Sequence, residues 1–455
     1  MRIRLLTLLA ALVLGLGLSG PALAQDAAPS YSIVPHTAPT SKIEVAQLPP
    51  AGVSNFDPIK ATDAYLAQIP AKDRARTDAY FEGGYVLQVV DLVYVLVVAG
   101  LLLWLKISSR MRTIAERITR YRWLQVPIYT VQYIVITTVV ALPLTIYEGF
   151  FREHKYGLSN QTFGQWFGEF GTSFLIEIFA FSLVLTLIYA AARKVQRSWW
   201  KWGAGISVVF AVLMIAAGPV FIQPLFNKYT PLPESATRNA ILSLARSQGI
   251  PAKDVYLVDA SRQSKRVSAN VSGLLGTTRI ALNDNLMNRC TPSEVLQVLG
   301  HEMGHYVMNH VGNMIVWFGL IICFGFWFVD RVFHGLVRFF GARWDVRGIA
   351  DPAGLPLIMA VFSVFMFLVT PVTNTLIRTQ EIQADLFGLN LVRQPDAEAK
   401  VDLMLGEYRK MDPSPLEEFL FFDHPSGRYR ILMAMRWKAE HLNDPDIMAG
   451  PISPQ

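Results

Sequence analysis

Long apolar runs alternate with polar segments along this chain. Six runs of about 20 apolar residues are each long enough to cross the hydrocarbon core of a bilayer. They lie near residues 85–106, 127–147, 172–192, 203–221, 312–329 and 354–372. The pattern predicts an α-helical multi-pass membrane protein, with four transmembrane spans in residues 81–226 and two more in residues 312–373.

The N-terminus has a pattern of its own. Two early arginines precede an apolar run that ends in Ala22-Leu23-Ala24. This is typical of a secretory signal with an A-x-A cleavage site, so we predict a signal peptide over residues 1–24. A retained first span is the alternative. Residues 25–80 are rich in Ala, Pro, Ser and Asp, and we expect a mobile tail there.

The polar segment over residues 227–311 contains the motif His301-Glu302-Met303-Gly304-His305. Thr291 as N-cap, Pro292 at the first helical position and Glu294 closing a capping box predict that a helix starts shortly before it. On a helix both histidines share one face and can bind one Zn²⁺, with Glu302 as general base for the attacking water. The alternative is a buried helix whose histidines only pack, which would leave Glu302 unpaired.

A third ligand is needed, because a catalytic zinc usually has three protein ligands and one water. In the polar segment over residues 374–455, Glu381 and Asp385 stand one helical turn apart. One carboxylate can bind the ion, and the other can hold a ligand histidine by its second ring nitrogen. An exposed acidic turn is the alternative. For His310 and His154 we expect interfacial or structural roles.

These two segments predict a catalytic domain that the last two spans divide. Its first portion would be residues 227–311 with the zinc helix, and its second portion would be residues 374–455 with the third ligand. Hydrophobic residues make up 52% of the chain and charged residues only 17%, which supports a membrane protein with small polar regions rather than a soluble enzyme.

Loop charges predict an orientation in the membrane. Basic residues gather after the first, third and fifth spans, at Lys106, Arg110, Arg112, Arg117, Arg120, Arg122, Arg193, Lys194, Arg197, Lys201, Arg331, Arg338, Arg343 and Arg347. By the positive-inside rule these loops are cytoplasmic, so a site in the cell (inner) membrane would face the periplasm. A cytoplasmic site is the alternative. This placement accounts for the net charge of +6, and no nucleic-acid partner is predicted.

Together, these segments resemble the integral-membrane zinc endopeptidases typified by the type-1 CAAX prenyl protease, the a-factor-converting enzyme. The resemblance rests on residues 153–162, 224–233, 268–273, 301–305, the Glu381 and Asp385 pair, and 424–426. It implies a zincin-like domain with one zinc per chain, held by His301, His305 and Glu381, and Glu302 activating the water.

The resemblance also implies roles around the ion. Asp385 would orient a ligand histidine, and Arg430 matches an arginine of the family. His424 would donate a hydrogen bond to the oxyanion at the mouth of the site, although a structural histidine beside a turn proline is the alternative. Ser268, Ala269 and Asn270 would belong to an edge strand that pairs with an extended substrate.

We therefore expect a membrane-embedded zinc metalloendopeptidase that cuts peptide or protein substrates, with prenylation of the substrate left open. One alternative is a stress-linked quality-control protease of the heat-shock type, in keeping with turnover of membrane or exported proteins. Another is a non-enzymatic membrane protein with structural zinc. Glu302 argues against the latter, because a structural site has no need of a base.

Overall fold

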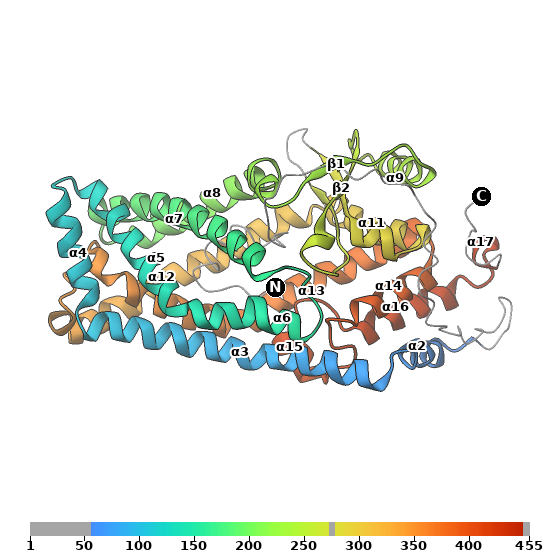
Figure 1. The fold of residues 1–455 in the computed structure, drawn as a ribbon, viewed down its shortest axis with the longest axis horizontal. Coiled ribbons are helices and arrows are strands. Elements are labelled where there is room, and N and C mark those ends of the chain that lie inside the picture. Colours follow the sequence, from blue (N-terminus) through green and yellow to red (C-terminus); the bar gives the residue numbers. More distant parts are fainter. Residues whose placement is uncertain (1–55, 273–277, 449–455) are drawn as a thin grey trace.

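The computed structural model describes residues 56–272 and 278–448, and they form an elongated bundle of long helices with a small sheet toward one end (Figure 1). The predicted signal peptide and most of the predicted tail lie outside the described residues. Among the residues described, six helical stretches are long and apolar enough to cross a membrane, and each corresponds to one predicted span. The chain is a multi-pass membrane protein, as the apolar runs predicted.

The six stretches are α-helices, and three of them are lengthened by short π or 3₁₀ turns. Their bounds are α3 Ala71–Trp104, α5 Arg122–Ile146, α6 Arg152–Lys155, α7 Phe163–Lys194, α8 Trp199–Ala217, α12 His310–Trp344 and α13 Leu355–Val392, with π turns Tyr147–Phe151 and Gly218–Ile222 and 3₁₀ turns Gln223–Leu225 and Pro352–Gly354; α4, Ile107–Ile118, is a connecting helix. At about 1.5 Å per residue, a helix as long as α3 exceeds the ~30 Å hydrocarbon core. The long helices therefore continue beyond the membrane, where α13 carries the second polar segment's first residues.

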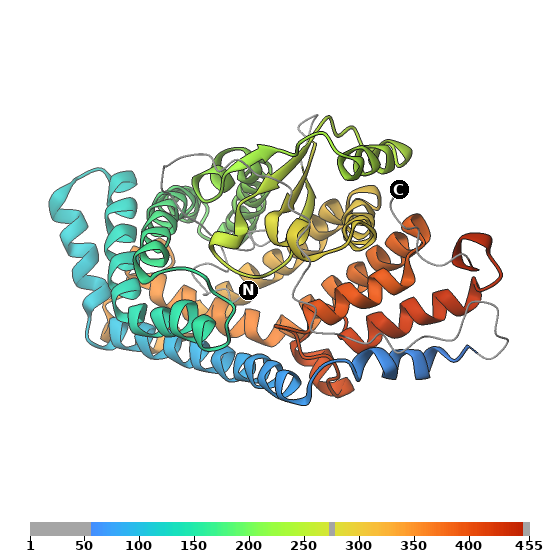
Figure 2. The same ribbon diagram turned by 45° about the vertical axis from the view of Figure 1, so that its right-hand side comes forward.

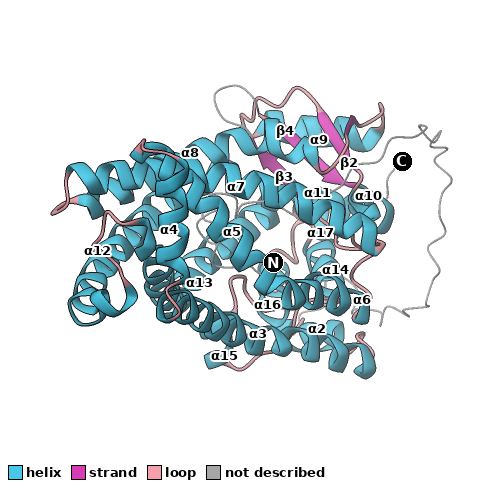
Figure 3. Ribbon diagram, turned by 60° about the vertical axis from the view of Figure 1, so that its left-hand side comes forward, coloured by secondary structure: helices cyan, strands magenta, loops and turns pink. Residues whose placement is uncertain are grey.

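The first polar segment forms a four-stranded mixed sheet that lies over the helix α11, Pro292–Val307 (Figure 3). The strands β1 Tyr229–Pro231, β2 Val255–Val258, β3 Ala269–Ser272 and β4 Arg279–Asn283 take the order β1-β2-β4-β3. The β2–β4 pair is parallel and the outer pairs are antiparallel. Helices α9 Ala236–Ser247 and α10 Asp284–Arg289 and a 3₁₀ turn at Ala260–Arg262 complete this segment.

The second polar segment adds a layer of short helices on the other side of α11 and α13 (Figure 2). These are α14 Pro395–Leu405, α15 Pro415–Phe421, α16 Gly427–Glu440 and α17 Pro445–Met448. The two polar segments, separated in sequence by two spans, thus meet along the contact between α11 and α13. That these two segments form one catalytic domain, divided by the last two spans, stays a prediction.

The end of the predicted N-terminal tail is helical rather than irregular. Helix α2, Pro58–Leu66, packs on α14 and α16, and α3 already begins at Ala71. Asp57 caps α2 by accepting hydrogen bonds from two backbone amides, and Pro58 stands at the start of the helix. Tyr65 is buried, and its hydroxyl donates to Asp396 over 2.8 Å. The prediction of a mobile tail was wrong for this short amphipathic stretch, because it rested on the composition of residues 25–80 as a whole.

Helices α11 and α13 approach closely because small residues face each other. A Cβ added at Gly388 of α13 would lie 2.9 Å from the backbone nitrogen of His301, and one at Gly300 of α11 would lie 3.2 Å from the Cα of Gly388. Gly304 similarly faces Ala384. This contact brings the motif helix against the helix that carries Glu381 and Asp385.

The opposite end of the bundle gathers the basic loops and α4 (Figure 1). Arg112 of α4 is buried there and donates to Asp351 over 2.6 Å and to Asp345 over 2.7 Å, both in the connection between α12 and α13. The connection that joins the fifth and sixth spans is therefore tied to α4, which follows the first span.

Candidate metal centre

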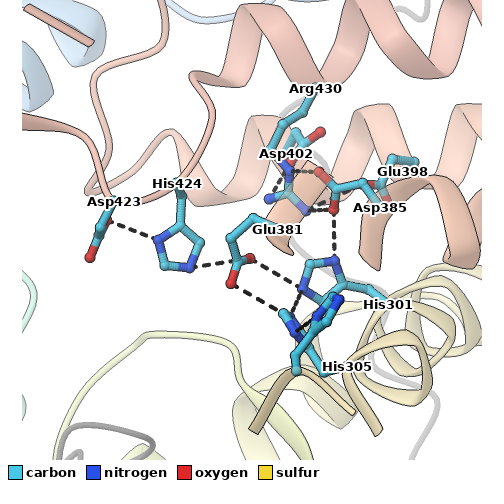
Figure 4. A network of polar contacts seen from close by, with 10 residues as sticks. His301, His305, Glu381, Asp385, Glu398, Asp402, Asp423, His424 and Arg430 are labelled. Atoms are coloured by element: carbon cyan, nitrogen blue, oxygen red, sulfur yellow. Dashed lines mark hydrogen bonds and ion pairs between the residues drawn. The ribbon is translucent and has the colours of Figure 1, made fainter. Parts of the chain in front are cut away.

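Three side chains from α11 and α13 converge at the contact between these helices (Figure 4). The Nε2 atoms of His301 and His305 are 3.0 Å apart, and the carboxylate oxygens of Glu381 lie 3.4 Å from the first and 3.5 Å from the second. One atom from each of the three residues lies within 4.8 Å of the others, which is a grouping able to hold a metal ion. The helical spacing of four in the motif places both rings on one face, as predicted.

Asp385 stands behind this group. Its carboxylate is fully buried and accepts a hydrogen bond from Nδ1 of His301 over 2.7 Å. Because the proton of the His301 ring is on Nδ1, Nε2 keeps its lone pair, and that atom lies beside His305 and Glu381. Arg430 of α16 in turn donates to both oxygens of Asp385, over 2.8 Å and 2.5 Å. The pair therefore fixes the ring of His301 from outside the centre.

Glu302 lies between the two histidines in sequence and is partly buried. Burial raises the pKa of its carboxyl to about 7, and the neighbouring His301 acts against that rise. A carboxylate with a pKa near neutrality at the edge of a metal centre can accept a proton and release it again.

His424 lies in the connection between α15 and α16. Its Nε2 is 3.4 Å from an oxygen of Glu381, and its Nδ1 is 2.9 Å from Asp423 (Figure 4). Arg378 of α13 donates to the backbone oxygens of Glu418 and Phe422, which fixes the end of α15. His424 thus reaches the same carboxylate as the two motif histidines.

The predicted substrate strand is β3. Ala269 and Asn270 belong to it, and Ser268 precedes it and accepts a backbone hydrogen bond from Asn283 of β4. Among the described residues β3 pairs with β4 alone, so its other edge is unpaired. The strand also packs against α11, the helix that carries the motif. Its role in binding substrate stays a prediction.

Sequence reasoning assigned four residues of this region no part in the site, and expected only an interfacial or structural role for His310. Glu398 and Asp402 of α14 are buried and lie 3.3 Å and 2.8 Å from Arg430. His310 and Gln383 lie on the other side, next to His305. One signal was available: Arg430 stands one helical turn before the buried Ala434 on α16, and a buried guanidinium indicates buried acidic partners.

Comparisons with known proteins agree with this geometry. Residues 231–438 match the family described as peptidase family M48, and residues 61–228 match the description "CAAX prenyl protease N-terminal, five membrane helices". A metalloprotease of Bacillus subtilis (strain 168), the uncharacterized YhfN, is 33% identical over 75% of this chain and 79% of its own length. The chain belongs to peptidase family M48.

Further relatives include CAAX prenyl protease 1 of Saccharomyces cerevisiae, 29% identical over 65% of this chain and 69% of its own length. The crystal structure of S. mikatae Ste24p shares the fold, with a TM-score of 0.66 and 22% identity over 83% of this chain and 95% of that one. The protein is thus a membrane metalloendopeptidase similar to the CAAX prenyl proteases, which confirms the predicted class.

Proposed function

We propose that this M48 peptidase is zinc-dependent, with His301, His305 and Glu381 as ligands and Glu302 as general base. The convergence of the two imidazole nitrogens and one carboxylate is the observation that carries the proposal. Two histidines and one carboxylate form one of the common ligand sets of catalytic zinc.

The spacing of the three side chains fits that ion. In a tetrahedral site with bonds of 2.0–2.1 Å, neighbouring ligand atoms are roughly 3.4 Å apart. The corresponding separations here are 3.0, 3.4 and 3.5 Å. Asp385 holds the tautomer of His301 that leaves Nε2 free for an ion. The three residues therefore fit zinc and leave the fourth position to solvent or substrate.

When bound, zinc supplies a Lewis acid that polarises the scissile carbonyl and acidifies the attacking water. Glu302 takes the proton of that water and passes it to the leaving amine. His424 donates a hydrogen bond to the carbonyl oxygen as negative charge develops there. The free edge of β3, with Ser268, Ala269 and Asn270, holds the substrate in an extended form by backbone pairing.

The substrate class we propose is a peptide tethered to or embedded in the membrane, such as a prenylated C-terminus. The names of several relatives point to CAAX substrates. Independently, Glu381 stands nine residues beyond the predicted span that ends at residue 372, or about 14 Å along α13. A site at this height favours substrates held near the membrane surface.

We also propose that the site faces the periplasm. The end of the bundle with α4, where the basic loops gather, lies away from α11, the helix that carries the motif (Figure 1). Under the positive-inside rule, that basic end is cytoplasmic.

Glu302→Gln tests the function. Purified in detergent, the variant should keep one zinc per chain and lose at least a hundredfold in cleavage of a quenched peptide panel, because general-base catalysis contributes about 10²–10⁴-fold. His301→Ala should lose the zinc as well. A prenylated and an unprenylated version of one peptide belong in the panel and test the substrate class. Cleavage by Glu302→Gln at the wild-type rate would contradict the mechanism.

A further inference from the structure

The two motif histidines are held from behind in different ways. His301 donates from Nδ1 to a carboxylate, that of Asp385. His305 instead faces a second imidazole: its Nδ1 is 2.8 Å from Nδ1 of His310. His310 is buried at the start of α12, and its Nε2 is 3.1 Å from Oε1 of Gln383 on α13. The side chains of His305, His310 and Gln383 thus form a row of contacts that starts on the side of the His305 ring opposite Nε2.

The chain of side chains has one arrangement of protons that is compatible with a metal ion. A neutral imidazole carries one N–H and one lone pair. Metal binding takes the lone pair of His305 at Nε2, so its proton must sit at Nδ1 and be donated to Nδ1 of His310. His310 then carries its own proton at Nε2 and donates it to the amide oxygen of Gln383. The reverse direction would place a proton on Nε2 of His305 and block the ion.

We propose that His310 and Gln383 are positioning residues for the metal ligand His305. They fix its tautomer and ring orientation, as Asp385 does for His301. This inference rests on the proposed zinc site and deepens it. It assigns to His310 a role beyond the interfacial or structural one that its position in the sequence suggested.

The backbone between the two histidines supports the assignment. Helix α11 ends at Val307 and α12 begins at His310, with Asn309 between them in the left-handed conformation at φ 52°. A non-glycine residue in this region is uncommon, and the tight turn folds the start of α12 back toward His305. The turn, rather than a helical repeat, therefore brings two histidines five positions apart into contact.

The test measures zinc affinity by competition with a chromophoric chelator, using the full chain in detergent. His310→Phe keeps a planar ring but has no acceptor for the proton of His305, so zinc affinity should fall 10–100-fold. His310→Asn should recover most of that loss, because its amide oxygen can accept the same proton. Gln383→Leu, at an exposed position, should weaken zinc binding several-fold.

Controls separate this role from a structural one. His334→Phe carries the same change near the far end of α12, where His334 bonds its own helix, and should bind zinc as wild type does. The rise in melting temperature on adding zinc to the stripped protein should shrink in His310→Phe, whereas a purely structural loss would lower both melting temperatures equally.

An affinity within twofold of wild type in His310→Phe or in Gln383→Leu would overturn the proposal. If His310→Phe does not fold, Gln383→Leu decides it. Wild type that binds no zinc would instead overturn the proposed function, so the two failures can be told apart.

Discussion

Behind the metal centre, one guanidinium faces three buried carboxylates. Arg430 lies 2.5 Å from Asp385, 3.3 Å from Glu398 and 2.8 Å from Asp402. A single positive charge cannot balance three negative ones out of contact with water. Burial accordingly raises the pKa of Asp402 well above its ordinary value, and burial together with Asp385 raises that of Glu398. The cluster thus favours a protonated Asp402.

This charge balance predicts a pH dependence of stability. Because the folded protein holds the proton on Asp402 more tightly than the unfolded chain, the contribution of this group to stability is fully present at low pH and falls as the pH rises above about 4. One such group contributes at most about 1.4 kcal/mol per pH unit. Asp402→Asn mimics the protonated form, so its melting temperature should fall less steeply between pH 5 and 8.

At the lowest accessible pH the two proteins should melt together, which serves as the internal control. The variant still contains the other charged groups near Asp402, namely Glu398, Asp385, Arg430 and Arg409. Its melting temperature should therefore keep a smaller dependence on pH. Equal slopes in wild type and variant would contradict the assignment of the proton to Asp402.

At the scale of residues, the sequence revealed those side chains whose spacing along one helix forms a recognisable ligand pattern. The two histidines and the carboxylate pair Glu381 and Asp385 could be found because a helical repeat of four is a local property. The choice of Glu381 as the ligand and the roles of Asp385 and Arg430 followed from the family resemblance, and they stay predictions. Arg430 indicated only that buried acidic partners exist. That these are Glu398 and Asp402, and that His310 and Gln383 lie beside His305, could not be predicted, since only the packing of α11, α12, α13, α14 and α16 brings them together.

At the scale of elements, the contact between α11 and α13 sets the distance between the histidines and Glu381. Gly388→Ala would place a methyl group 2.9 Å from the backbone nitrogen of His301. A backbone atom cannot rotate away, so the helices must separate. We expect a loss of about 1–3 kcal/mol in stability, as for other overpacked sites, and weaker zinc binding.

The control for this substitution is Gly335→Ala, in α12, where an added methyl group meets nothing within 4 Å. It should leave both the melting temperature and zinc binding near wild type. A Gly388→Ala variant that binds zinc with unchanged affinity would show that the close approach is not required.

The long helices were the most predictable elements, because apolar runs of span length are rare outside membrane helices. The start of α3 and all of α2 were missed, since these stretches are amphipathic and polar overall. The strand order β1-β2-β4-β3 could not be predicted either: strands of three to five residues carry too little pattern to select partners.

At the scale of the whole molecule, the orientation in the membrane can be measured. In a background with Cys290 and Cys323 replaced by Ser, Lys106→Cys marks the basic end and Lys253→Cys marks the end with the sheet. A membrane-impermeant maleimide should label Lys253→Cys in intact cells and Lys106→Cys only after lysis. The converse pattern would place the catalytic site in the cytoplasm.

The joining of the two polar segments was predictable from chemistry alone, because a two-histidine site requires a further ligand and one stood beyond the last span. The extent of the molecule beyond the membrane could not be predicted, because it depends on helices that continue past their apolar runs.

The helical hairpin of α12 and α13 is held at both of its ends. Arg112 ties its closed end to α4 through Asp345 and Asp351. At its open end, a bound ion would join His301 and His305, just before α12, to Glu381 near the end of α13. The ion would then act as a cross-link that closes a loop containing two transmembrane helices. Its removal would leave that end held by the packing of α11 on α13 alone.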